Sequence, residues 1–190
     1  VTGQGSFDVN AHWQGQAKLS IEPSVLGDVP LKALLDWRSA TAGQGMHLLA
    51  DASIGPNTLQ AKGNATLVKD AQGAWSLGPD TTLEAQWQAP SLGAMGPWAA
   101  FLGADQVQGS SEGQLRVQGR WPQLSSTGMA QMRNVVWRTL AQRVLSVPQF
   151  NAQWNWQGAA PQSATTVLIH AADIRMGDPK AQMLVLPKVD

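Results

Sequence analysis

The heptapeptide Phe150-Asn151-Ala152-Gln153-Trp154-Asn155-Trp156 places an apolar residue at every second position and an amide at each position between. In a β-strand, residues two apart point to the same face of the sheet, so this stretch would have one apolar and one polar face. A helix, with about 3.6 residues per turn, would scatter both sets around its surface. The heptapeptide therefore predicts a strand with two chemically different faces.

The same alternation runs along most of the 190-residue chain. Turn-forming residues such as Gly27-Asp28-Val29-Pro30 and Gly55-Pro56-Asn57 interrupt it, often at intervals of about 10 to 15 residues. Successive antiparallel strands suit such a pattern, so we predict an all-β fold. In the region 127–146 the alternation of apolar and polar residues is less regular. Two strands with a bulge, or a short helix near 140–145, would both fit it.

One short helix is predicted near 96–102, because Pro97 stands near a helix start and Gly103 at its end. Its bulky residues would let it plug an open sheet edge or trough end, and packing beneath a loop explains them at least as well. We predict one segment over residues 1–190, excised from a longer chain, with a weak sub-division near 90–105 as the only candidate boundary.

Nine tryptophans without a tyrosine are an unusual balance, and several of them end a weak repeat. In it, a bulky apolar residue is followed two positions later by a small or branched one and six positions later by Trp. The repeat begins at Phe7, Leu31, Leu115 and Phe150. These offsets keep the three residues on one strand face. The tryptophans would fit the core of a β-sandwich or a concave face that contacts lipid chains. A carbohydrate-stacking platform fits less well, because the tryptophans are spread over the whole chain.

Composition argues against several function classes. Thirteen Lys and Arg balance thirteen Asp and Glu, so the basic excess of a nucleic-acid groove is missing. The chain has no cysteine, which excludes disulfides and zinc–thiolate sites. His12, His47 and His170 have no partner at metal-ligand spacing, and no phosphate-binding or catalytic motif occurs. We expect no enzyme activity, no cofactor, no metal site and no nucleic-acid partner.

A family resemblance rests on Gly113-Gln114-Leu115-Arg116-Val117-Gln118-Gly119-Arg120-Trp121-Pro122-Gln123-Leu124-Ser125-Ser126-Thr127-Gly128. This phrase is similar to a recurring one in the TamB/AsmA-like bacterial envelope proteins. Segments 132–137 and 168–174 and the apolar stretch 98–102 also resemble strands and phrases of that family. The resemblance covers residues 83–175 best. The resemblance rests on the general strand pattern and on short phrases. The family has no catalytic motif whose residues could be assigned in this sequence.

The resemblance implies an elongated, mainly antiparallel curved sheet that forms a taco-like groove with a hydrophobic interior. It also implies a periplasmic location in a Gram-negative bacterium, with an inner-membrane anchor outside these residues. The implied function is to hold lipid acyl chains for phospholipid transport between the two membranes and to support outer-membrane protein assembly. An outer-membrane barrel of the TamA type would be the partner of the full-length protein. The alternative is a scaffold or chaperone-like module that binds client β-strands at its edges.

The candidate groove residues are the bulky apolar members of the alternating runs, expected to face lipid. They are Phe7, Val9, Trp13, Leu19, Ile21, Leu31, Leu35, Trp37, Leu48, Ile54, Leu59, Leu67, Leu83, Trp87, Leu115, Val117, Trp121, Phe150, Trp154, Trp156, Val167 and Ile169.

Overall fold

The computed structural model describes residues 2–8, 14–39, 45–69, 73, 75–100, 103–120, 123–158, 166–177 and 184–189. Strands account for most of them. The elements are β1 (Thr2–Asp8), β2 (Gln14–Leu26), β3 (Val29–Ser39), β4 (Gly45–Ile54), β5 (Asn57–Lys69), β6 (Trp75–Leu77), β7 (Thr82–Ala89), η1 (Leu92–Met95), α1 (Gly96–Ala99), β8 (Ala104–Gln118), β9 (Ser125–Thr139), β10 (Val144–Gln157), β11 (Thr166–Gly177) and β12 (Leu184–Val189).

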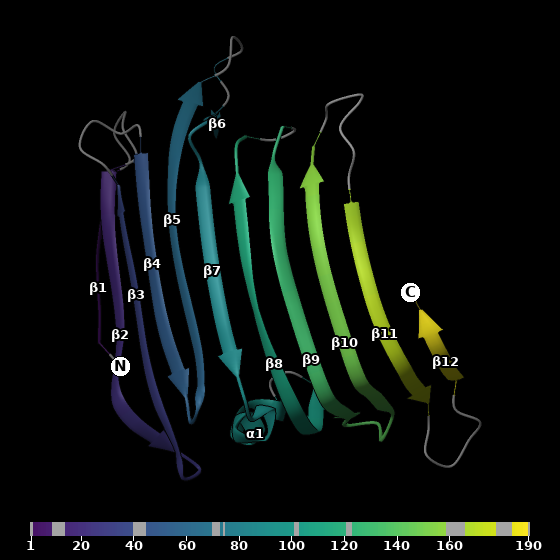
Figure 1. The fold of residues 1–190 in the computed structure, drawn as a ribbon. Coiled ribbons are helices and arrows are strands. Elements are labelled where there is room, and N and C mark those ends of the chain that lie inside the picture. The colour runs from purple at the N-terminus through teal and green to yellow at the C-terminus, as the bar shows by residue number, and fades with distance from the viewer. Residues whose placement is uncertain are drawn as a thin grey trace.

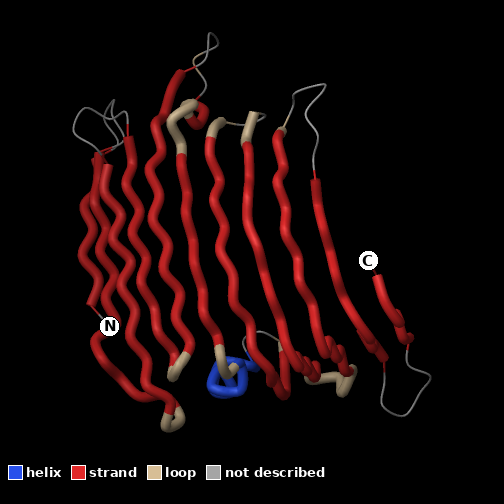
Figure 2. The backbone as a smooth tube through the Cα atoms, viewed as in Figure 1, coloured by secondary structure: helices blue, strands red, loops and turns tan. Residues whose placement is uncertain are grey.

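All twelve strands belong to one sheet, and strands that are consecutive in the chain pair with each other except at β6, where β5 pairs with β7 (Figure 1). The order is β1-β2-β3-β4-β5-β7-β8-β9-β10-β11-β12, and β6 pairs with β5 at the side of this path. Paired strands are antiparallel throughout, as hairpin connections require. Figure 2 shows one layer of strands with helix at a single place. The predicted all-β, antiparallel fold is therefore confirmed.

The register keeps apolar residues on one face across the whole sheet. One row of directly opposed residues runs Leu19, Leu35, Ala50, Ala61, Ala85, Leu115, Gly128, Trp154 and Val167. Directly opposed residues point to the same side, so these side chains share one face, here called the inner face. Neighbours one position along each strand point to the opposite, outer face.

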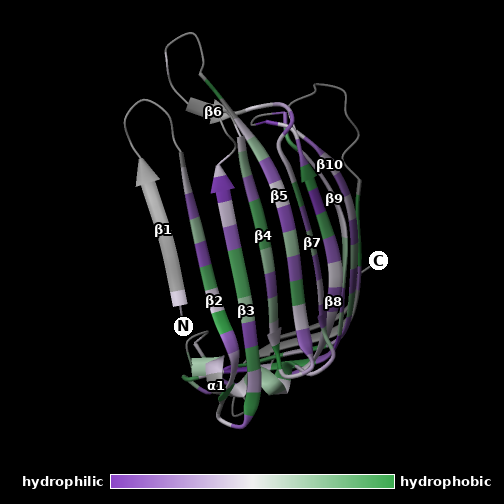
Figure 3. Cartoon of the chain, turned by 90° about the vertical axis from the view of Figure 1, so that its left-hand side faces the viewer, coloured by the Kyte–Doolittle hydropathy of each residue, from purple (hydrophilic) through white to green (hydrophobic). Residues whose placement is uncertain are grey.

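The sheet curves and stays unclosed, so that it forms an open, taco-like trough with an apolar interior. Figure 1 shows β7 to β11 face-on and β1 to β4 crowded together, whereas the side view in Figure 3 spreads β1 to β5 out. Along β8 and β10, inner-face residues are half-buried and their outer-face neighbours are mostly exposed. Because no second layer covers either face of the described strands, the shelter of the inner face comes from the curl of the sheet and from neighbouring side chains.

The strands β8 and β9 are bent by a bulge near one end. Between Ser110 and Gln108 the strand β8 advances two residues while β9 advances three. Gly109 and Asn134 both have positive φ at this level, which marks the extra residue of a bulge. In Figure 1 the lower ends of β8 to β11 recede from the viewer. The bulge and this bend lie at the same end of the sheet as α1.

A small core and the short helix lie beside the bend. Buried Ala99, Ala104 and Val107 pack together with Leu92 and Trp137 around them. Asn57, only 7% exposed, holds this segment to the start of β5. Its Nδ2 donates to the Ser91 carbonyl (2.8 Å), and its Oδ1 accepts from the Ser91 N–H (3.1 Å).

The exposed area shows how little of the chain is core. The chain exposes 12423 Å², whereas a compact protein of this mass would expose about 8,800 Å². No large side chain among the described residues is fully buried. The β-sandwich interpretation of the tryptophans is therefore wrong, because both faces of the described sheet stay uncovered.

Two local predictions also have outcomes. The helix predicted near 96–102 is one turn, α1, preceded by the 3-10 turn η1, and residues 101 and 102 lie outside the described part. The region 127–146 forms two strands and a turn, with the bulge in β9, so the alternative of a helix near 140–145 is wrong.

Candidate functional site: the inner face of the sheet

The candidate groove residues in the described part lie on the inner face. Beside the row already given, a second row runs Ala17, Trp37, Leu48, Gly63, Leu83, Val117, Ser126 and Trp156. A third runs Ile21, Ala33, Ala52, Leu59, Trp87, Gly113, Ala130, Ala152 and Ile169. These three rows contain fourteen of the candidates and are here called the central rows.

The remaining candidates lie around the central rows. Leu31 pairs with Ile54, and Phe150 pairs with Met132, both in the adjoining row towards the bend. In the backbone register, Phe7 is opposite Gly15 and Leu67 is opposite Leu77. Three candidates, Val9, Trp13 and Trp121, lie outside the described residues.

The central rows carry no charged side chain, and their only polar one is Ser126. Alanine and glycine occupy many of the positions in β4 to β10. Small residues suit the concave side of a curved sheet, where side chains converge, and long ones suit the convex side. Leu35, Leu59 and Ile169 nevertheless keep 41–44% of their surface exposed. The result is an uncharged, solvent-accessible apolar surface that crosses β2 to β11.

Two tryptophans lie flat on this surface, each over a glycine of the neighbouring strand. Trp87 is opposite Gly113 and Trp154 is opposite Gly128. A Cβ atom placed on either glycine would overlap the indole ring, so only glycine leaves the ring room to lie there. Each indole Nε1 donates to a serine hydroxyl on the same neighbouring strand, to Ser111 Oγ and Ser126 Oγ, both at 3.0 Å.

The two Trp–Gly–Ser sets are related by a local two-fold axis. The axis is normal to the sheet and passes between Gln114 of β8 and Met129 of β9, which are directly opposed. It exchanges β7 with β10 and β8 with β9, and so brings each set onto the other. The middle of the inner face is therefore paved by two symmetry-related indoles.

Sequence reasoning placed the tryptophans on the correct strands and missed their glycine and serine partners. In the phrase 113–128 that resembles the family, Gly113 and Gly128 were interpreted only as residues at which strands begin. The available signal was a glycine inside a strand pattern, which marks a place where another group approaches closely. Finding that group requires the register, because Trp87 is 26 positions before Gly113 in the chain.

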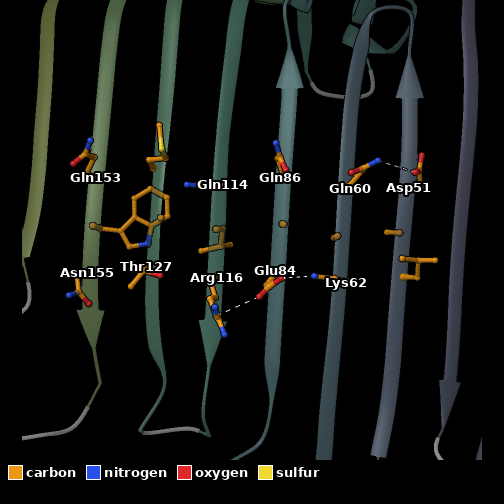
Figure 4. A pocket seen from close by; sticks show the side chains of 18 of the residues that line it. Asp51, Gln60, Lys62, Glu84, Gln86, Gln114, Arg116, Thr127, Gln153 and Asn155 are labelled. Carbon is orange, nitrogen blue, oxygen red and sulfur yellow. Dashed lines mark hydrogen bonds and ion pairs between the residues drawn. The ribbon is translucent and has the colours of Figure 1, made fainter.

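The outer face carries the charges. A shallow depression there is lined by polar side chains of β4 to β10, including Gln60, Gln86, Gln114 and Gln153 (Figure 4). Glu84 lies in the middle of this depression. It accepts from Lys62 Nζ at 2.9 Å, and Arg116 Nε lies 3.6 Å from its other oxygen. Since these cations are already paired with a carboxylate, the depression is a solvated strand face with balanced charge.

A pH-dependent contribution to stability is expected from Glu84. The Lys62 ammonium, with help from Arg116, holds the pKa of Glu84 below its ordinary value of 4.5. A lowered pKa in the folded state stabilises the fold above the ordinary pKa, and this stabilisation disappears as the pH falls through the lowered value. We expect Glu84→Gln to lower the urea midpoint slightly at pH 7 and to match the wild type once the pH is below the lowered pKa of Glu84.

Gln86→Glu is the matched control. It puts a carboxylate on the same strand and face, opposite Gln60 and Gln114 rather than opposite cations. Because this variant keeps Glu84 and its added carboxylate is opposite no cation, its stability should change with pH as that of the wild type does, and about 1 M salt should erase the Glu84 effect. Equal pH profiles for both variants would show that the ion pairs contribute nothing.

The described residues assemble no cluster of metal-binding side chains. No group of three or more His, Asp or Glu within them could hold a metal ion. His47, one of the isolated histidines, contacts the Asn64 amide oxygen through Nδ1. In the same residues, no helix has the length and apolar character needed to cross a membrane.

Comparison with known proteins adds no functional information, so a functional proposal must rest on the fold and on the chemistry of its two faces. No protein-family model, curated protein or solved structure matches the chain. What the structure defines is an open, single-layer β-trough with an uncharged inner face and a polar outer face.

Proposed function

We propose that the inner face holds the acyl chains of lipids, as part of a non-catalytic envelope protein that moves phospholipid between the inner and outer membranes. The observation that carries the proposal is the uncharged apolar surface of the central rows, which crosses β2 to β11 without a covering layer. In a soluble domain, apolar surface of this extent normally marks a place where another apolar group binds.

The chemistry of the surface suits hydrocarbon chains. Transfer of a methylene group out of water contributes about 0.8 kcal/mol, and an open trough can shield one side of the chain. The central rows offer no charge and no cluster of polar groups to a headgroup, so they would hold a chain by contact area alone. Weak, distributed contacts of this kind favour movement along the surface over capture at one point.

The resemblance to TamB/AsmA-like proteins supports the same proposal and adds its setting. In that setting the chain belongs to a longer periplasmic protein that is anchored in the inner membrane outside these residues. An outer-membrane barrel of the TamA type would receive the full-length protein, which would also support outer-membrane protein assembly.

Tryptophan fluorescence tests the proposal directly. Trp37, Trp87, Trp154 and Trp156 belong to the central rows. Phosphatidylethanolamine brominated in the middle of its acyl chains should therefore quench the emission of the purified chain, whereas the unbrominated lipid should not. Native mass spectrometry of the same sample should show bound phospholipid. Equal emission with both lipids and no lipid in the mass spectrum would refute the proposal.

A second function rests on the edges of the sheet. In the described residues, β1 pairs only with β2 and β12 only with β11, so each leaves one strand edge open. Open edges can accept a further strand through backbone hydrogen bonds. A client-strand scaffold would crosslink an unfolded barrel peptide at β1 or β12 and would not require bound lipid. Crosslinks at neither edge would eliminate this function.

A further inference from the structure

One indole N–H in the central rows has no acceptor among the described residues. Trp87 and Trp154 each donate to a serine hydroxyl, at 3.0 Å in both cases. Trp156 also lies in a central row and is half-buried, but its Nε1 donates to no described residue. This nitrogen keeps contact with solvent. A ligand on the inner face can therefore reach the Trp156 N–H.

A second donor stands opposite this indole. Ser126 of β9 is directly opposed to Trp156 of β10, so their Cβ atoms are about 5 Å apart on the inner face. The Ser126 oxygen already accepts from the Trp154 indole. A hydroxyl that accepts in this way still has its own hydrogen to donate. An indole N–H and a hydroxyl O–H are therefore available at the same place on an otherwise apolar surface.

Of the two sets related by the local two-fold axis, one has this pair of donors. The axis brings Ser126 onto Ser111. At the position equivalent to Trp156, however, β7 has Ala89, which is opposite Ser111. Ser111 thus offers a hydroxyl alone, whereas Ser126 has an indole donor opposite it. A ligand held by the donor pair would have a defined direction on the inner face.

We propose that Trp156 is a specificity-determining residue of the inner face. Its indole N–H, together with the Ser126 hydroxyl, binds the carbonyl oxygen at the head of an acyl chain. A carbonyl oxygen has two lone pairs, so both donors can bind one atom. The inference rests on the proposed function, because it names the part of a lipid that is held at this place.

The physical reason is the cost of covering a donor with hydrocarbon. An indole N–H under an alkyl chain loses its hydrogen bond to water and gains none in return, whereas an ester oxygen supplies the acceptor. The central rows have no cation. A carboxylate would therefore be desolvated there without a charged partner, so the neutral ester binds in preference to the free fatty acid anion.

The test offers the whole chain two probes with equal numbers of heavy atoms, methyl tetradecanoate and heptadecane. Each protein is equilibrated with an equimolar mixture, and the bound probes are extracted and measured by gas chromatography. Trp156→Phe keeps an aromatic ring and removes the N–H. Its bound ester-to-alkane ratio should be about fivefold lower than that of wild type, the equivalent of one net hydrogen bond. Wild type should retain less tetradecanoate, offered in place of the ester, than methyl tetradecanoate.

Trp87→Phe is the matched control. It makes the same change on the same face, at an indole whose N–H already donates to Ser111, and should keep the wild-type ratio. Nuclear magnetic resonance of isotope-labelled indoles gives a second reading on wild type. The Trp156 N–H signal, identified by its loss in the Trp156 variant, should move downfield with the ester and not with heptadecane. The Trp87 signal should move downfield with neither probe.

Each outcome has one meaning. A lower ratio in the Trp156 variant, with the wild-type ratio in the Trp87 variant, supports the inference. An unchanged ratio, or an equal fall in both variants, overturns it and leaves the proposed function standing. If the Trp156 variant binds neither probe, a wild-type Trp156 signal that the ester moves supports the inference, and one that stays in place overturns it. Equal retention of tetradecanoate and its ester overturns the preference for the neutral carbonyl group. Failure of wild type to bind any probe overturns the proposed function itself.

Discussion

Leu48→Asp is expected to remove most of the phospholipid that co-purifies with the chain, by about tenfold or more. Leu48 lies in a central row between Trp37 and Gly63, where an acyl chain would lie against it. A carboxylate there has no cation on its face, so covering it with hydrocarbon would desolvate an unpaired charge. Native mass spectrometry of variant and wild type, purified identically, measures the loss.

The chain supplies a matched control for this variant at the next position. Leu49 is also a leucine of β4, but it points to the outer face and is 48% exposed. Leu49→Asp should leave the lipid content unchanged. Ile169 and Leu168 form a second such pair on β11, inner and outer respectively. Equal lipid contents in the Leu48 and Leu49 variants would refute lipid binding on the inner face.

Replacing Gly113 and Gly128, the glycines beneath the two indoles, with alanine is expected to destabilise the chain by about 2–5 kcal/mol. A Cβ on Gly113 would come within 2.5 Å of the Met129 carbonyl oxygen, and one on Gly128 within 2.7 Å of the Gln114 carbonyl oxygen. Each would also overlap the tryptophan above it. The indoles must then leave the sheet, losing their serine acceptors and exposing apolar surface. Urea unfolding followed by circular dichroism measures the change.

The direction of the change in stability distinguishes a steric conflict from the ordinary effect of replacing glycine with alanine. Without a steric conflict, Gly→Ala within a strand would raise stability slightly, because glycine loses more backbone entropy on folding. Gly96→Ala is the control, since a Cβ at Gly96 would have no atom within 4 Å. It should be neutral or stabilising. A double variant as stable as the Gly96 variant would show that the indoles do not depend on the glycines.

Much of the fold was predictable because alternation is a local property of the sequence. The alternation from Phe150 to Trp156 predicts two chemically different strand faces without information from any other strand. Sequential hairpins then bring matching faces together, so the inner-face side of each candidate in the described part followed from the pattern. Curvature towards the apolar face was expected from the family resemblance and is what the sheet shows.

Features that depend on pairing between strands were not predictable in this way. The poor phase of 127–146 arises because Asn134 adds a residue to β9 opposite Gly109, which shifts the alternation beyond it. Neither residue signals the bulge by itself. The seating of Trp154 on Gly128 likewise depends on register, and each residue alone has an ordinary role in a strand. Of the helix predicted near 96–102, the described residues form α1 over Gly96–Ala99, and residues 101 and 102 lie outside the described part.

The order of strands has a consequence for how such a protein can change its reach. Neighbouring strands are about 4.8 Å apart, so the eleven strands of the main path span about 48 Å measured along the curved sheet. Insertion of a whole hairpin would lengthen this span and leave every side chain on its own face. Insertion of a single residue in a strand would turn every following side chain to the opposite face. Duplication of whole hairpins is thus a route by which evolution can enlarge the apolar inner face without reversing it.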